Sequence, residues 1–149
     1  MPVREELMGE ARRMRRLQAE SAEEMDIKRG RGGIADVEML VYAVSAASGV
    51  RGGTLVETIN ELARTGIFTL GQAAEASAGY RFLSKIERFL LLAKPDGAGI
   101  LPRVEERRSV ATAAGYRDSI RKSAAGLLTE DVDYHRGAAA GLFESMTTA

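Results

Sequence analysis

The residues best suited to chemistry lie between positions 28 and 38, in the segment KRGRGGIADVE. Three basic side chains and three glycines lead there into an expected helix, and two acids follow in its first turns. Glycines let a backbone turn tightly and approach a ligand, and the free N–H groups of a first helical turn favour an anion. The pattern predicts an anion-binding or partner-facing loop built from Lys28, Gly30, Arg31, Gly32, Gly33, Asp36 and Glu38.

The same segment also has a purely structural interpretation, because basic glycine-rich turns are common and need no ligand. In that case ion pairs, Lys28 with Asp36 or Arg31 with Glu38, would fix the loop. The two acids stand two positions apart and project in different directions from a helix, so one would face a partner while the other holds the loop. Spacing alone leaves both interpretations open.

Two other groups of reactive side chains predict no catalytic or metal site. His135 is the single histidine and cysteine is absent, so a nucleophilic hydroxyl would need this residue as its base. Its place four residues after Asp131 predicts an ordinary pair on one helix face. Asp131 and Asp133 form a D-x-D, but on a helix such acids diverge by roughly 200°, whereas two-metal chemistry needs converging carboxylates. We expect acids that match the dipole of a helix N-terminus.

The composition narrows the class of protein. Of the 149 residues 45% are apolar, and 21 basic side chains balance 21 acidic ones to a formal net charge of zero. That balance argues against a general nucleic-acid binder. No apolar run reaches the roughly 18 residues of a membrane span, and the charged N-terminus does not resemble a secretory signal. We therefore expect a cytoplasmic protein without a nucleic-acid or membrane partner.

Hydrophobic spacing places these residues on helices. No segment alternates with the period of two that is typical of a strand, so the expected fold is all-α, a bundle of about six helices with one long central helix. We expect one domain over 1–149, with a charged N-terminal helix within 1–25 and a bundle over 26–149 that the glycine-rich loop opens. The expected helices run over about 3–22, 34–49, 54–66, 69–93, 104–114 and 129–147, with a weak short segment over 116–128.

Capping residues set several of these boundaries. Thr54 with Glu57 and Thr69 with Gln72 form capping boxes, and Gly66 is placed as a C-terminal stop.

The helix over 69–93 has apolar side chains on two faces and is expected at the bundle centre, whereas Thr129 is expected to cap the last helix. The first helix should lie on the outside and carry a narrow apolar stripe of Leu7, Ala11, Met14 and Leu17.

The pattern K-x-G-x-G-G-x-x-D-x-E over 28–38 resembles the motif that opens the helical domain of glutamine synthetase adenylyltransferases, and PII uridylyltransferases carry a related version. The similarity continues through 57–90, with YRFL at 80–83 and Glu87 in place. It also includes Leu-Pro at 101–102 and Ala-Gly-Tyr at 114–116. The resemblance therefore covers most of the chain.

This resemblance implies a helical domain that packs against a nucleotidyltransferase domain in the same or a separate chain. The full-length family enzymes transfer AMP from ATP to glutamine synthetase with Mg²⁺. Their catalytic carboxylates follow a Gly-Ser turn on strands, and this sequence has no Gly-Ser pair. We therefore expect no catalytic residue, metal ligand or cofactor in this chain. Lys28 and Arg31 would place the loop near the nucleotide or the domain interface. The Asp at position 36 makes this chain slightly more similar to the half of the family enzyme that attaches AMP than to the half that removes it.

Some positions depart from the family pattern. Family members often have Arg in place of Ala35, Gln in place of Tyr42 and His-Arg in place of Arg88-Phe89. A lost arginine removes a forked donor suited to phosphate or carboxylate. The alternative hypothesis is therefore a stand-alone, non-catalytic module whose loop binds a protein or a small anion. A third is a scaffold that dimerises through exposed apolar helix faces.

Overall fold

The computed structural model describes residues 2–22, 25–94, 99–103 and 106–148. Within these stretches, six α-helices follow one another: α1 Pro2–Ser21, α2 Ile34–Ser48, α3 Leu55–Arg64, α4 Leu70–Ala93, α5 Arg108–Ala113 and α6 Ala124–Thr148. The same stretches contain no strand, only an isolated antiparallel bridge between Asp26 and Ile100. No helix in them has both the length and the apolar character needed to cross a bilayer. The predicted all-α bundle is confirmed.

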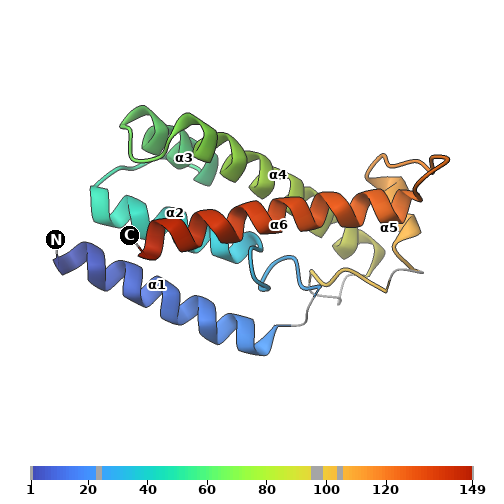
Figure 1. Ribbon diagram of the computed structural model, residues 1–149, viewed down its shortest axis with the longest axis horizontal. Helices are drawn as coiled ribbons and strands as arrows, with labels where there is room; N and C mark the ends of the chain where they lie inside the picture. The colour runs from blue at the N-terminus through green and yellow to red at the C-terminus, as the bar shows by residue number, and fades with distance from the viewer. Residues whose placement is uncertain (1, 23–24, 95–98, 104–105, 149) are drawn as a thin grey trace.

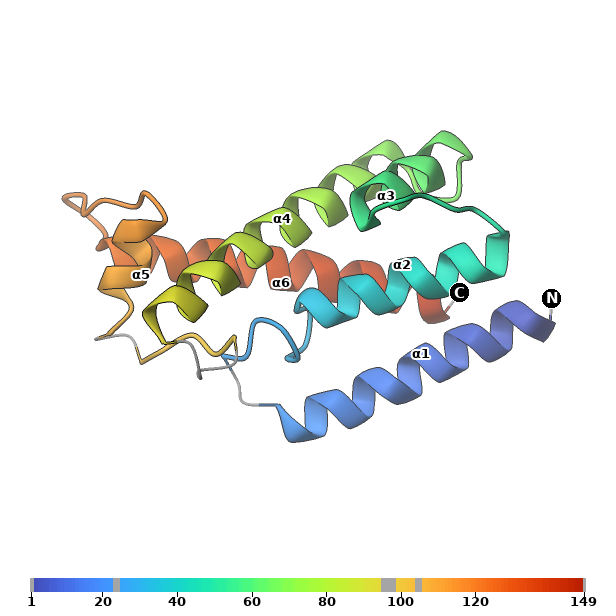
Figure 2. The same cartoon turned by 180° about the vertical axis from the view of Figure 1, so that it is seen from behind.

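Helix α6 runs along most of the length of the bundle (Figure 1). It contacts α1, α2, α4 and α5, while α3 packs on α2 and α4. Figure 2 shows α2 between α1 and the α3–α4 pair, with α5 at the end of the bundle away from both chain termini. The predicted central place of the helix over 69–93 is confirmed, because α4 contacts α2, α3, α5 and α6. Helix α6 is equally central and slightly longer, with 25 residues against 24 in α4.

The apolar core has two parts along the bundle. One lies between α1, α2, α3 and the C-terminal half of α6, and includes the fully buried Phe68 and Phe143. The other lies between α4, α5 and the N-terminal half of α6, and includes Ile27, Ile34 and Leu128. Complete burial of such a side chain stabilises the fold by about 1.5–3 kcal/mol. Ile27 and Ile34 therefore anchor both ends of the glycine-rich loop in this second part.

The predicted caps of the middle helices are confirmed. The Thr54 hydroxyl accepts the Glu57 N–H at 3.1 Å, and the Glu57 carboxylate accepts the Thr54 N–H at 3.0 Å. Thr69 and Gln72 make the same exchange before α4. Gly66 adopts a φ of +77° just after α3, as a C-terminal stop requires.

The predicted start of the last helix is wrong. Helix α6 begins at Ala124 instead of Thr129, and residues 116–123 form a loop instead of a short helix. The Ser123 hydroxyl accepts the Gly126 N–H at 3.0 Å and so caps this earlier start. A single interior glycine costs a helix only about 1 kcal/mol, so Gly126 does not interrupt it.

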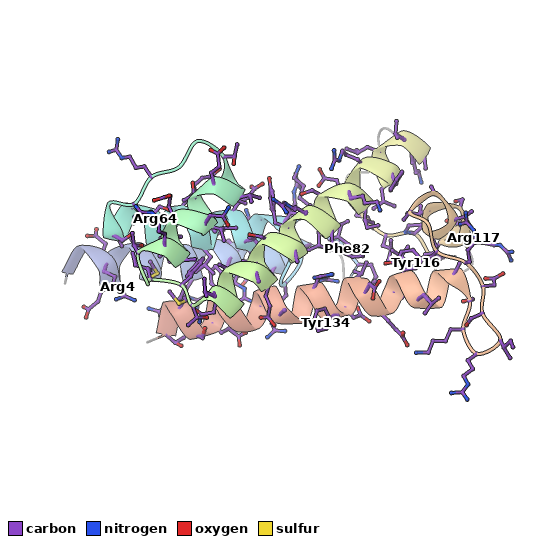
Figure 3. All side chains as sticks on the ribbon, turned by 90° about the horizontal axis from the view of Figure 1, so that it is seen from above. Arg4, Arg64, Phe82, Tyr116, Arg117 and Tyr134 are labelled. Carbon is purple, nitrogen blue, oxygen red and sulfur yellow. The ribbon has the colours of Figure 1, made fainter. Side chains whose placement is uncertain are left out.

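The acids and the histidine near 131–135 therefore lie inside α6 and not in its first turn. Asp131 accepts a hydrogen bond from the Tyr116 hydroxyl, and burial, together with this bond, raises the pKa of Tyr116. His135 is half-buried with its ring 4.6 Å from that of Phe82, and desolvation lowers its pKa although Asp131 opposes the shift. Phe82 and Tyr116 both lie between α4 and α6 (Figure 3). The dipole-matching role predicted for Asp131 and Asp133 is thus wrong.

Helix α5 begins at Arg108, later than predicted, and positions 104 and 105 lie outside the described residues. On α1 the apolar stripe is only partly correct. Ala11 is buried, but Met14 and Leu17 are 46% and 55% exposed. The inner face instead passes through Met8, which is buried, and Arg15, whose side chain is 14% exposed. On this inner face Arg15 pairs with acidic side chains, as described below.

Candidate functional site

The glycine-rich loop, residues 26–33, closes on itself before α2 begins. The Asp26 side chain accepts the N–H groups of Lys28 at 3.0 Å and Arg29 at 2.8 Å. Its carbonyl oxygen accepts the Gly30 N–H at 2.9 Å. Aspartate commonly forms such a turn by accepting bonds from the backbone that follows it. The first half of the loop is therefore fixed by one buried acid, Asp26, which sequence reasoning did not select.

The first turn of α2 has its backbone N–H groups occupied. The N–H groups of residues 34–37 donate to carbonyl oxygens of Ile27, Lys28 and Gly33, at 2.9–3.4 Å. The Gly32 N–H donates to the Asp36 carboxylate at 2.7 Å. The expectation that free N–H groups here would hold an anion is therefore wrong. An anionic group would have to be bound by side chains of this loop.

All three glycines are required by the close approach of other backbone atoms. A Cβ on Gly32 would overlap the carbonyl oxygen of Arg136 on α6, and the φ of +73° there also favours glycine. A Cβ on Gly30 would overlap the Asp26 carbonyl oxygen, and one on Gly33 would lie 2.6 Å from the carbonyl oxygen of Ile27. The glycines therefore let the loop fold tightly and lie directly on α6.

Asp36 holds this loop from inside the fold. It is 1% exposed, and its carboxylate accepts the Gly32 N–H and lies 3.1 Å from Nε of Arg15 on α1. Burial raises the pKa of Asp36, while the Gly32 N–H and the Arg15 guanidinium act against that rise. The predicted ion pair between Lys28 and Asp36 is wrong, because the partner of Asp36 comes from α1.

Arg15 is a second residue that sequence reasoning missed. Its guanidinium carbon lies 4.5 Å from the centre of the Phe143 ring, and its Nη1 lies 3.7 Å from the Glu144 carboxylate. Glu144 also pairs with Arg31 at 2.7 Å, so the predicted pair of Arg31 with Glu38 is wrong as well. The only sign of it in the sequence is that Arg15 continues the helical spacing of the inward-facing residues Met8 and Ala11.

Three cations of the segment, Lys28, Arg29 and Arg31, lie on the outer side of the loop. The side chains of Lys28 and Arg31 are 51% and 62% exposed, and Glu38 is half-buried. Lys28 Nζ lies 3.8 Å from one oxygen of Glu87 on α4. The other oxygen of Glu87 is buried and has no hydrogen-bond partner among the described residues. The structure therefore divides the predicted site into an inner part that fixes the loop and an outer, charged part.

The outer part offers charged side chains for binding. Across the described stretches no three His, Cys, Asp or Glu side chains gather closely enough to hold a metal ion. An exposed lysine can bind a carboxylate or phosphate group through its ammonium charge. An exposed arginine can bind the same groups through two parallel N–H bonds of its guanidinium.

Comparison with known proteins points to one enzyme family. The sequence model of the family described as GlnD PII-uridylyltransferase matches residues 3–147. The chain is 32% identical over 136 residues to the bifunctional glutamine synthetase adenylyltransferase/adenylyl-removing enzyme of Mycobacterium tuberculosis. It is 30% identical over 135 residues to the enzyme of the same name from Mycobacterium avium. Each alignment covers 85% of this chain and 14% of the relative, so the chain spans about one seventh of their length.

A more distant organism gives the same result over a shorter stretch. The bifunctional glutamine synthetase adenylyltransferase/adenylyl-removing enzyme of Xanthomonas campestris is 36% identical over 97 residues, which are 61% of this chain and 10% of that protein.

Proposed function

The chain belongs to the GlnD PII-uridylyltransferase family, and we propose that it packs as a helical domain against a nucleotidyltransferase domain. It is similar to one part of enzymes named for attaching and removing adenylyl groups on glutamine synthetase. In this proposal the glycine-rich loop faces the nucleotidyltransferase domain. The activity of the whole enzyme is AMP transfer from ATP to glutamine synthetase in the cytoplasm, with Mg²⁺ and ATP bound by the other domain.

The observation that supports this proposal is the division of the motif into two parts. The glycines and Asp36 make the close contacts and the hydrogen bond that fix the loop, so they are not the groups that would bind a ligand. Lys28 and Arg31 lie on the outside of the same rigid loop. A preorganised loop that carries cations binds acids or phosphates at a lower entropy cost than a mobile one. The loop therefore suits a contact with an acidic interface or with nucleotide phosphates.

The first experiment asks whether chemistry resides in this chain. The purified chain is incubated with Mg²⁺, glutamine synthetase and ATP labelled in its AMP portion. We expect no label on glutamine synthetase, because no cluster of His, Cys, Asp or Glu side chains in the described residues could hold the Mg²⁺ that the transfer needs. Label transferred by the chain alone would contradict the proposal that catalysis lies in another domain.

The second experiment asks whether the loop is the contact. A nucleotidyltransferase domain from the Mycobacterium tuberculosis relative is titrated with the chain by calorimetry. The double variant Lys28→Ala and Arg31→Ala should bind about tenfold more weakly, because two interfacial cations are lost. Arg51→Ala is the matched control, since Arg51 is exposed beyond the far end of α2. Equal affinity of all three proteins would show that the loop does not form the interface.

The alternative function, a stand-alone anion-binding module, makes a different prediction. It requires the isolated chain to bind inorganic phosphate or ATP through Lys28 and Arg31. The occupied N–H groups at the start of α2 weigh against this function. Phosphate binding by the chain that is lost in the double variant would favour it.

A further inference from the structure

The loop between α5 and α6, residues 116–123, stands out from the end of the bundle opposite the chain termini (Figure 1). We call it the basic loop, because its sequence YRDSIRKS has three basic residues and one acid in a chain of zero net charge. Ile120 is 105% exposed, the highest value among the large apolar side chains that the structure describes. A single exposed apolar residue is ordinary on a protein surface. The surroundings of Ile120 are not ordinary.

The basic loop is held rigid on both sides of Ile120. The Ser119 N–H donates to the Lys122 carbonyl oxygen at 2.8 Å, and the Lys122 N–H donates to the Ser119 hydroxyl at 3.0 Å. The Asp118 carboxylate accepts the Ala124 N–H at 2.8 Å and pairs with Arg108 at 3.0 Å. These bonds form a turn that projects Ile120 away from the bundle. Its apolar surface is thus presented with little conformational entropy left to lose.

Positive charge flanks this apolar side chain. Arg117, beside α5 in Figure 3, bonds only to backbone carbonyl oxygens, so its charge has no acidic partner among the described residues. Arg121 is exposed one position after Ile120. Only Lys122 pairs with an acid, Glu130, at 2.5 Å. The surface around Ile120 therefore carries net positive charge.

We infer that the basic loop docks onto an acidic protein surface, with Ile120 entering an apolar pocket and Arg117 and Arg121 meeting carboxylates around it. An apolar anchor surrounded by charged groups is the usual anatomy of a protein interface. A nucleic acid would satisfy the arginines but offers no pocket for isoleucine. A lipid surface would gain little, because even a whole myristoyl chain gives only marginal membrane binding and Ile120 is far smaller.

We assign glutamine synthetase as the occupant, and this assignment rests on the proposed function. The relatives are named for action on that protein. If the glycine-rich loop faces the nucleotidyltransferase domain, the basic loop at the end of the bundle remains accessible to a protein substrate. The basic loop then helps to hold the substrate while the other domain transfers AMP.

The test measures binding of the whole chain to immobilised glutamine synthetase by surface plasmon resonance. Ile120→Ser and Arg121→Glu should each weaken binding about tenfold or more, since each removes a central contact. Binding should also fall with rising salt, because exposed charges are screened. Leu70→Ser is the matched control, because Leu70 is 81% exposed at the start of α4, away from the basic loop.

The result that would overturn the inference is no binding by the unaltered chain, or equal binding by all variants. Attachment to phosphatidylserine vesicles that depends on Ile120 would overturn it too, because the partner would then be a membrane. Circular dichroism checks that each variant remains folded. Failure here is distinct from failure of the proposed function, which is judged by titration with the nucleotidyltransferase domain and the Lys28 and Arg31 variants.

Discussion

Two basic loops lead into long helices in this molecule, and they are built in opposite ways. The glycine-rich loop before α2 and the basic loop before α6 each contain three basic residues, and each uses an aspartate to accept a backbone N–H. The first lies against the α6 backbone and is closed by buried bonds. The second has no glycine, lies in solvent and is held by surface bonds. The two loops have similar charge, but the glycine-rich loop packs against the bundle and the basic loop is exposed to solvent.

The largest difference should appear when alanine replaces a glycine of each region. In Gly32→Ala the new Cβ meets the Arg136 carbonyl oxygen, and the left-handed φ adds strain, so we expect a loss of about 4 kcal/mol in unfolding free energy. Gly115, just before the basic loop, also has a positive φ but has open space around it. Gly115→Ala should cost only about 1–2 kcal/mol. Urea unfolding measures both, and equal losses would remove the distinction between the loops.

An isoleucine in each loop gives the next comparison. Ile27 is fully buried in the core, whereas Ile120 is fully exposed. Ile27→Ala should therefore destabilise the fold by about 3 kcal/mol through lost burial and a new cavity. Ile120→Ala should change the unfolding free energy by less than about 0.5 kcal/mol. A large loss for Ile120→Ala would mean that this side chain packs within the fold, and the docking role would then lack its basis.

Substitution of the two aspartates should also change the unfolding free energy by different amounts, although the difference is smaller. Asp36→Asn leaves the Arg15 guanidinium buried without its closest acid, which should cost about 2–3 kcal/mol. Asp118→Asn keeps an oxygen that accepts the Ala124 N–H and loses only an exposed ion pair. Its cost should stay below about 0.5 kcal/mol. Thermal unfolding followed by circular dichroism compares them, and a larger loss for Asp118→Asn would reverse the assignment.

The smallest expected effect is a pH response around the glycine-rich loop. Burial raises the pKa of Asp36 above its ordinary 3.8, so the native state retains this proton and stability falls as pH rises through that range. The bond from Arg31 lowers the pKa of Glu144 below 4.5, so its stabilisation is present above that value and is lost as pH falls.

Variants separate these two responses. With rising pH the stability gap between wild type and Asp36→Asn should narrow, and the gap between wild type and Glu144→Gln should widen. Urea titrations across the acidic range provide the measurement. Two gaps that move in the same direction would contradict the opposite pKa shifts.

Local sequence signals account for much of the fold. Two capping boxes and the glycine at position 66 set helix ends through bonds between near neighbours, so spacing alone reveals them. The start of α6 is harder to predict from the sequence, because part of its cap comes from Asp118, six residues before Ala124. Gly126 looks like a break in a sequence but is tolerated once both caps are made.

The inner part of the candidate site could not be read from spacing. Arg15 reaches Asp36 and Glu144 from a different helix, and its place on the inner-face spacing 8, 11, 15 does not reveal those partners. The close approach of the Gly32 backbone to Arg136 brings together positions over 100 residues apart, and it depends on tertiary packing that spacing does not reveal. The motif locates the loop in the sequence, but which of its members face inward follows from how α1 and α6 cover it.

Amide hydrogen exchange of the intact chain, followed by NMR, tests the central contrast most directly. If the glycine-rich loop is a closed support, the N–H groups of Gly32 and residues 34–37 exchange slowly, while those of Ile120 and Arg121 exchange fast, and added phosphate changes neither. Fast exchange at Gly32 and at 34–37 that phosphate slows would mean that these N–H groups form an open anion site. The glycine-rich loop would then be a ligand-binding loop and not a support.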